Sequence, residues 1–140
     1  MTWKNEIKRC LEEYRVLKKG LSIVLKRIRD IDKILKRQQN TAEETSATLN
    51  DFKMNLYAER MILTANFKRA KLVIDSVESA MSQLNDEQKL ILTEMYVDKN
   101  PDWESKLGSA LRYQRRSLYL AAGNALRDFG MIYYLLPNGF

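Results

Sequence analysis

Residues 86–129 read DEQKLILTEMYVDKNPDWESKLGSALRYQRRSLYLAAGNALRDF, and this stretch carries the clearest structural pattern in the chain. Trp103 to Leu111 forms a short amphipathic segment, Arg112 to Gln114 interrupts it, and a second segment begins at Arg115. Apolar residues recur at helical spacing on either side of the interruption, at Leu107, Leu111, Leu118, Ala122, Ala125 and Leu126. Two short helices joined by about three residues, the second with a basic start, predict a helix-turn-helix.

The two segments resemble the region 4 helix-turn-helix of sigma-70-type factors. In that family a rough Ile-Ala-x-x-Leu pattern precedes the turn, and Leu107-Gly108-Ser109-Ala110-Leu111 stands at that place here. The family's recognition helix follows a Ser-x-x-Thr-Val-x-x-x-x-x-x-Ala-Leu pattern, matched in part by Gln114, Ser117-Leu118 and Ala125-Leu126. Gly108 replaces the usual Ala, and Arg112 replaces the usual turn Gly.

The likeness is greater with small region-4-like proteins of phages and prophages of Gram-positive bacteria, among them the RinA-type and ArpU-type late-gene regulators. These proteins often carry a Trp that opens the first helix and a Tyr-x-Arg-Arg-x-x-Tyr start of the second. Trp103 and the run from Tyr113 to Tyr119 match both features. The resemblance covers about the last third of the chain. It implies a transcriptional regulator that binds double-stranded DNA and contacts RNA polymerase.

The candidate DNA-binding residues cluster at the start of the second segment. Arg pairs with guanine and Gln with adenine in the major groove, so Gln114, Arg115 and Arg116 are the candidate base readers. Other polar side chains nearby can reach phosphates or sugars, which set the register of a protein on DNA. The candidate set is Arg112, Tyr113, Gln114, Arg115, Arg116, Ser117 and Tyr119.

The composition argues against catalysis. The chain has 140 residues, no histidine and a single cysteine, Cys10. Catalytic triads, the usual zinc sites and an internal disulfide therefore lack their residues. Adjacent carboxylates such as Glu12-Glu13 and Glu43-Glu44 point in different directions on a helix and are read as solvated surface. We expect no enzymatic activity, no cofactor and no metal.

One long helix is expected from about Trp3 to Gln38. Its apolar positions alternate at spacings of three and four: Trp3, Ile7, Cys10, Tyr14, Leu17, Leu21, Val24, Ile28, Ile31 and Leu35. A heptad seam of this kind is typical of coiled coils and helical bundles. Gly20 lies off the seam, and the helix is expected to run through it.

A second long helix is expected to follow a break at Asn40-Thr41. It begins either at a capping box, Thr41 to Glu44, or near Asn50 or Asp51, and ends near Gln83. Its expected apolar positions are Phe52, Leu56, Leu63, Phe67, Ala70, Ile74, Val77, Met81 and Leu84. The predicted fold is therefore all-α, with a coiled-coil-like antiparallel hairpin at residues 1–84 and a helix-turn-helix head at residues 85–140. A homo-oligomer, with a dimer favoured, would cover the remaining apolar surface.

Before the helix-turn-helix, Asn85 or Asp86 is expected to cap a helix that ends ahead of Pro101. Gly130 is expected to end the last helix as its C-terminal cap. The apolar run Met131 to Leu136 must then be covered, and docking onto the chain's own helices is favoured over a subunit contact.

The net charge of +6 is unevenly distributed. Residues 1–40 carry +7, residues 41–84 carry −1, and residues 85–140 are neutral. Basic side chains crowd the last turns of the first helix at Lys26, Arg27, Arg29, Lys33, Lys36 and Arg37. They favour that helix end electrostatically, or they form a phosphate-binding flank.

Two other functions fit the same pattern. A phage DNA-packaging protein of the small-terminase type also joins a helix-turn-helix to oligomerising helices. A helical protein-binding module without DNA binding is the third reading. The chain has no apolar run of membrane-spanning length and no apolar core of a signal peptide near its start, so a cytoplasmic location in a bacterial host is expected.

Overall fold

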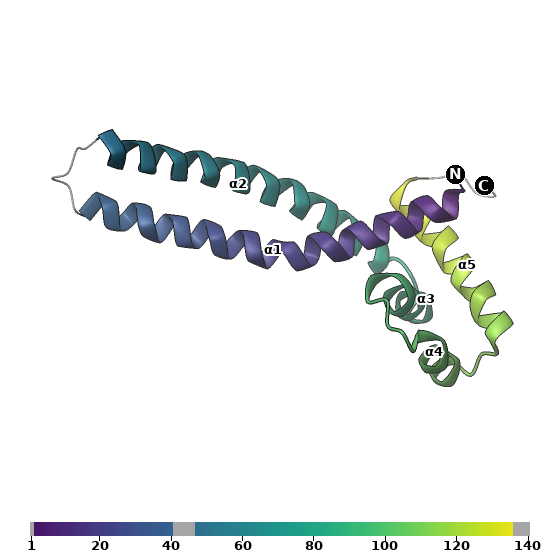
Figure 1. Cartoon of the computed structure of the whole chain (residues 1–140). Helices are drawn as coiled ribbons and strands as arrows, with labels where there is room; N and C mark the ends of the chain where they lie inside the picture. The colour runs from purple at the N-terminus through teal and green to yellow at the C-terminus, as the bar shows by residue number, and fades with distance from the viewer. Residues whose placement is uncertain (1, 41–46, 136–140) are drawn as a thin grey trace. The chain divides into compact units, whose positions relative to one another are not determined.

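The computed structural model describes residues 2–40 and 47–135, and within them helices joined by short turns make up the chain (Figure 1). No strand occurs among the described residues, which confirms the all-α class. The elements in chain order are α1 Trp3–Asn40, α2 Ala47–Ser82, α3 Asp86–Leu92, the π-helical turn η1 Thr93–Val97, α4 Trp103–Leu111 and α5 Arg115–Tyr133.

The chain forms two compact units, and the predicted functional division after residue 84 stays a prediction. One unit contains residues 17–72, and the other contains residues 1–16 together with residues 73–140. Helices α1 and α2 each contribute to both units, because each is continuous across the boundary. The start of α1 therefore belongs with α3, α4 and α5.

Helix α1 agrees closely with the helix expected from Trp3 to Gln38 and continues through Gly20. Its predicted seam is buried near both ends of the series, at Ile7, Cys10, Tyr14, Ile28, Ile31 and Leu35. The central seam positions Leu17, Leu21 and Val24 are only half-buried. Leu11, beside the seam, is also buried, so the apolar stripe of α1 is wider than a two-stranded coiled coil requires.

In the unit of residues 17–72, α1 and α2 lie side by side (Figure 1). Ile31, Leu35 and Leu56 form a buried cluster between them, extended by Ile34 and Leu63. Each fully buried aliphatic side chain contributes about 1.5–3 kcal/mol. Phe52, one of the expected apolar positions of α2, is 45% exposed in the single chain. The capping box proposed at Thr41 to Glu44 lies outside the described residues.

Two ion pairs flank this cluster. Arg27 Nε lies 2.7 Å from Glu59 Oε2, and Arg60 Nε lies 2.5 Å from Asp32 Oδ1. Both pairs are solvent-exposed, and such pairs contribute about 0–1 kcal/mol each. Apolar burial is therefore the main stabilising term in this unit, and the ion pairs favour the observed side-by-side register.

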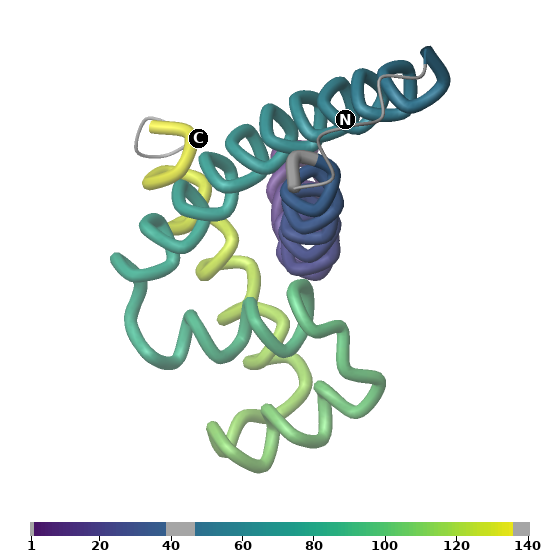
Figure 2. Tube along the Cα trace, turned by 90° about the vertical axis from the view of Figure 1, so that its left-hand side faces the viewer, coloured from purple at the N-terminus to yellow at the C-terminus, as the bar shows by residue number. Residues whose placement is uncertain are grey.

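In the other unit, α3, α4 and α5 share one core, and Figure 2 follows the chain through the turns that separate them. The buried residues of this core are Ile91, Leu107, Leu118 and Ala122. Asn85 begins α3 with a complete capping box: its Oδ1 accepts from Gln88 N at 2.8 Å, and Gln88 Oε1 accepts from Asn85 N at 3.3 Å. The sequence analysis proposed Asn85 or Asp86 as the N-cap of this helix, and the N-cap is Asn85.

Helix α5 continues past Gly130 to Tyr133, so the predicted cap at Gly130 is wrong. Phe129 is fully buried, and its ring stacks on Tyr133 with centroids 5.4 Å apart. Helix continuation allows this stacking, whereas a glycine cap would have ended the helix before Tyr133. Met131 and Ile132 are consequently half-buried on the helix, while Leu135 is exposed. Leu136 lies outside the described residues.

The end of α5 also contacts the buried thiol of Cys10. The hydroxyl groups of Tyr133 and Tyr134 donate hydrogen bonds to the Cys10 sulfur. Burial raises the pKa of the Cys10 thiol, and the hydroxyl donors only partly oppose this change. Cys10 is therefore a buried, protonated side chain that links α1 to α5.

Candidate nucleic-acid interface

Helices α4 and α5 are joined by Arg112, Tyr113 and Gln114. Arg112 has φ 57° and ψ 39°, the left-handed conformation that glycine adopts most easily. The backbone N–H groups of Arg112 and Tyr113 both donate to the Gly108 carbonyl. Arg112 therefore takes the backbone shape of a turn glycine despite its side chain.

Gly108, a residue of α4, leaves space for the backbone of this turn. A Cβ atom placed on Gly108 would lie 3.3 Å from the carbonyl oxygen of Tyr113, which is closer than an ordinary contact. An alanine there would push the Tyr113 carbonyl outward. The glycine at 108 and the left-handed Arg112 thus belong to the same close approach of helix and turn.

Gln114 is the N-cap of α5 and has an extended backbone, with φ −75° and ψ 160°. Its carbonyl accepts from Leu118 N at 2.9 Å, while its side chain makes no capping hydrogen bond. The Gln114 amide is therefore available for another acceptor or donor. Arg115, Arg116 and Ser117 follow it and are exposed, so the predicted base readers lie on the protein surface at the start of α5.

Tyr113 does not share that surface. It is half-buried, packs on the core of α3, α4 and α5, and donates a hydrogen bond to Glu87 of α3. This hydrogen bond is the first cause of the raised pKa of the Tyr113 hydroxyl. The side chain fastens the turn to α3, so in this arrangement its hydroxyl is occupied within the protein.

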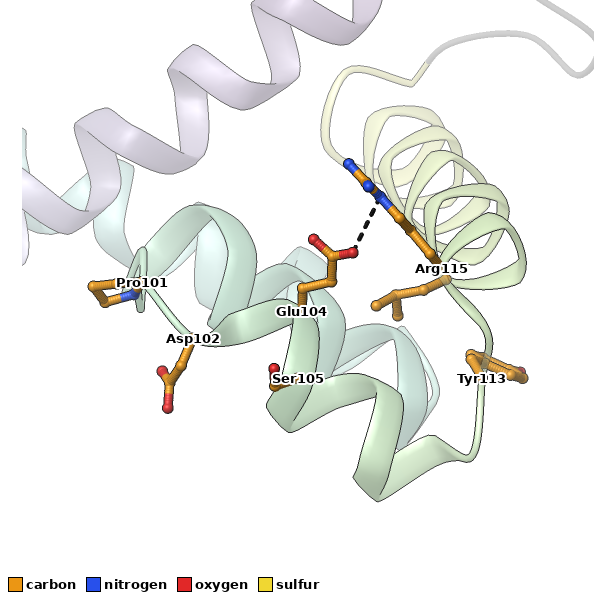
Figure 3. Close-up of a pocket in the computed structure, with 7 residues that line it drawn as sticks. Pro101, Asp102, Glu104, Ser105, Tyr113 and Arg115 are labelled. Carbon is orange, nitrogen blue, oxygen red and sulfur yellow. Dashed lines mark ion pairs between the residues drawn. The ribbon is translucent and has the colours of Figure 1, made fainter.

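Arg115 is held by α4. Its Nε lies 3.1 Å from Glu104 Oε1, and Figure 3 shows the two side chains pointing toward each other. Asp102 lines the same pocket, which has a volume of about 450 Å³. The surface next to Arg115 therefore carries two carboxylates, which would repel a phosphate.

Tyr119 connects the starts of the two helices. Its ring meets Trp103 edge to face, with centroids 5.5 Å apart, and the Arg115 guanidinium lies 5.8 Å from the same ring. Edge-to-face aromatic pairs add about 0.5–1.5 kcal/mol beyond apolar burial. The Trp and the second Tyr of the sequence pattern thus serve as a contact between α4 and α5, with Tyr119 still partly exposed.

The sequence analysis did not identify Glu94, a buried residue that positions α4 against η1. It is buried, with 7% of its surface exposed, and its carboxylate accepts from Asn100 Nδ2 and from Lys106 Nζ, the latter at 3.0 Å. Hydrogen bonds from Asn100 and then Lys106 lower the pKa of the Glu94 carboxyl. Glu94 thereby ties η1 to the turn before α4 and to α4 itself. Its only sequence signal is its place at helical spacing from the apolar residues Leu90 and Ile91.

A second groove lies between α5 and the first turn of α1. It has a volume of about 500 Å³ and is lined by Trp3, Lys4, Arg116, Tyr119, Leu120, Gly123, Asn124 and Arg127. The predicted phosphate flank at Lys26 to Arg37 belongs to the unit of residues 17–72, where Arg27 is paired with Glu59. The sequence analysis did not connect the first turn of α1 with α5, since no local pattern relates them.

The comparisons with known proteins leave the chain without an assigned relative: no family model, curated protein or solved structure matches it. In residues 2–40 and 47–135, no helix combines the length and apolarity needed to cross a membrane. The same residues contain no cluster of three or more Cys, Asp or Glu side chains arranged to hold a metal ion.

Proposed function

We propose that this protein is a sequence-specific DNA-binding regulator of transcription, of phage or prophage origin, with a head of the sigma-70 region 4 type. The observation that carries the proposal is the left-handed turn at Arg112 between α4 and α5. This turn sets an exposed row of Gln114, Arg115, Arg116 and Ser117 at the start of α5. In helix-turn-helix proteins, the start of the second helix is the part that contacts base edges.

In the proposed complex, Gln114 and Arg116 read bases and Ser117 contacts the backbone. Arg116 has the planar donor set that suits guanine, and the Gln114 amide suits adenine. Arg115 joins them after exchanging Glu104 for a DNA acceptor. Arg112 and Tyr119 lie at the edges of the row, where contacts to phosphate or sugar fix register. Tyr113 contributes by holding the turn against α3.

The proposal includes a dimer formed through the unit of residues 17–72, in which α1 and α2 form a coiled-coil-like antiparallel hairpin. Helix α2 is apolar on two sides: Leu56 is buried in the cluster with α1, whereas Met54, Tyr57, Met61 and Leu72 are exposed. These four residues recur at helical spacing along one outer face. A second copy covering this face would place two heads on one DNA, and a two-fold axis would fix the half-site spacing.

Footprinting of the full chain on the DNA that surrounds its own gene tests the proposed function. A protected site with ordered half-sites supports it, and addition of RNA polymerase tests the contact that the resemblance implies. Binding to duplex DNA as a closed ring of eight or more copies would favour the DNA-packaging alternative. Failure to bind any duplex at low salt would leave the helical protein-binding module.

A further inference from the structure

The groove between the first turn of α1 and α5 has the charge of an anion site. Lys4, Arg116 and Arg127 line it, and no carboxylate is among its lining residues. The neighbouring pocket beside Arg115 contains both Asp102 and Glu104. Within this unit, the basic character is therefore concentrated on the α1 side of α5, even though residues 85–140 have no net charge.

None of the three cations of the groove forms an ion pair with a carboxylate within the described part of the chain. The Lys4 ammonium lies 5.5 Å from the Trp3 ring centroid. An aromatic face attracts a cation without neutralising its charge. Lys4, Arg116 and Arg127 are thus available to an outside anionic partner.

Gly123 keeps the floor of the groove open. A Cβ atom placed there would lie 3.4 Å from Lys4 Nζ, an ordinary contact distance, so Lys4 passes close to α5 at Gly123. A glycine inside a helix is less favourable than alanine, so it does not benefit α5 itself. A side chain larger than alanine at this position would fill the groove that Lys4 and Arg116, one of the candidate base readers, both line.

We infer that this groove binds backbone phosphates of the duplex that α5 reads, with Lys4 and Arg127 as the phosphate ligands. The inference rests on the proposed function and adds to it: the beginning of α1, and not its basic far end, supplies the flanking contacts. Phosphate contacts of this kind supply affinity and register for all sequences alike. In the proposed complex, their attraction for the duplex offsets the repulsion between its phosphates and the carboxylates of Asp102 and Glu104 on the other side of Arg115.

The test is fluorescence anisotropy with the full chain and a duplex of arbitrary sequence, across a series of KCl concentrations. The Lys4→Gln, Arg127→Gln double variant should lose about 1.8 from the slope of log affinity against log salt, because each lost phosphate contact contributes about 0.9. Its affinity at 0.1 M salt should fall roughly tenfold or more. The Lys33→Gln, Lys36→Gln variant removes the same charge from the far end of α1 and should keep the wild-type slope.

A steric pair of variants tests the groove without changing charge. Gly123→Leu should fill the groove and weaken binding, whereas Gly123→Ala should bind as the wild type does, since its Cβ meets Lys4 at an ordinary contact distance. Circular dichroism confirms that each variant remains helical.

The outcomes separate the two proposals. If the wild type binds duplex and the Lys4→Gln, Arg127→Gln variant matches it in affinity and slope, the groove inference is overturned while DNA binding stands. If the wild type binds no duplex, the proposed function fails and this inference fails with it. Binding of a poly-glutamate peptide without duplex binding would identify an acidic protein segment as the occupant and would also overturn the inference.

Discussion

The guanidinium of Arg115 forms an ion pair with the carboxylate of Glu104, with Nε and Oε1 3.1 Å apart. Both side chains are substantially open to solvent, and exposed pairs of this kind contribute about 0–1 kcal/mol. The pair can therefore open at small cost when another acceptor is offered. Until it opens, Glu104 holds Arg115 toward α4 and places a negative charge beside the candidate reading surface.

Replacing Glu104 by Gln should strengthen DNA binding. The change frees Arg115 and removes a carboxylate that repels phosphate, so affinity should rise by roughly threefold to tenfold at low salt and less at high salt. Gel-shift titration at two salt concentrations measures the effect. Glu78→Gln, at an exposed position of α2, removes the same charge elsewhere; an equal rise in that control would assign the gain to net charge alone.

Replacing Arg115 or Arg116 by Ala should weaken binding to a specific site. If the side chain pairs with guanine, the loss should be about 1–3 kcal/mol and the preference at that base should relax. Competition assays with single-base variants of the site measure both quantities. Equal binding by wild type and the Arg115→Ala, Arg116→Ala double variant would contradict the assignment of these residues as readers.

Replacing Arg112 by Gly should stabilise the protein. Arg112 has φ 57°, a conformation that costs a residue with a Cβ roughly 1–2 kcal/mol. Because glycine also gains freedom in the unfolded chain, the net increase in the free energy of unfolding should be about 1 kcal/mol. Urea denaturation measures this change.

Arg112→Ala is the matched control for the turn, since it removes the long side chain and keeps the Cβ. It should give no comparable increase in stability. If the Gly and Ala variants were equally stable, the strain assigned to the left-handed turn would be absent, and the difference from wild type would come from the Arg side chain.

The stability of the protein should depend on the ionisation of Glu94. Hydrogen bonds from Asn100 and Lys106 lower the pKa of this carboxyl in the folded protein. Its stabilisation is therefore complete above the pKa of an unfolded Glu, about 4.3, and is lost as pH falls through the folded value. Glu94→Gln should lower the free energy of unfolding at pH 7 by about 1–2 kcal/mol. Because the variant has no carboxylate at this position, its free energy of unfolding should fall less than that of the wild type below about pH 4.3.

Urea denaturation at pH 7 and at pH 3 tests the role of Glu94, again with Glu78→Gln beside it. The wild type should lose more stability than Glu94→Gln on acidification, and the Glu78 variant should behave as the wild type does. Identical pH dependence in the wild type and the Glu94→Gln variant would show that the buried carboxylate contributes nothing through its ionisation.

Two aspartate substitutions should separate folding from self-association in the unit of residues 17–72. Ile31 is 0% exposed, so Ile31→Asp buries a carboxylate among apolar groups and should cost at least 3 kcal/mol, roughly enough to unfold the unit. Met61 is 73% exposed, so Met61→Asp should leave the helix content of the isolated chain unchanged. It should, however, dissociate the proposed dimer.

Sedimentation equilibrium and thermal melting distinguish these two effects. Met61→Asp should sediment as a single chain at concentrations where the wild type is a dimer. A wild-type mass for Met61→Asp would show that the outer face of α2 is not the dimer contact. An unchanged melting temperature for Ile31→Asp would contradict the buried position of that side chain.

Helix positions and their start signals were accessible from the sequence because they depend on neighbours within a few turns. The seam from Trp3 to Leu35 predicted α1, and the interruption at Arg112 separated α4 from α5 at nearly the observed residues. Asn85 could be proposed as a cap because its partner, Gln88, stands three residues away. Gly130 misled the prediction for the same reason, since a local rule for glycine ignores the stacking of Phe129 on Tyr133 that continues the helix.

The surroundings of the candidate site depend instead on contacts between elements. The helix-turn-helix pattern made Arg115 and Arg116 candidate readers, but only the packing of α4 on α5 places Glu104 against Arg115 and leaves Arg116 in a groove with Lys4. Likewise, Tyr113 matched a binding motif, and the fold directs its hydroxyl to Glu87. A helical period states which side of one helix is apolar. It carries no information about which charged residue of another helix will lie beside an exposed side chain, and that neighbour determines whether an arginine is paired or available.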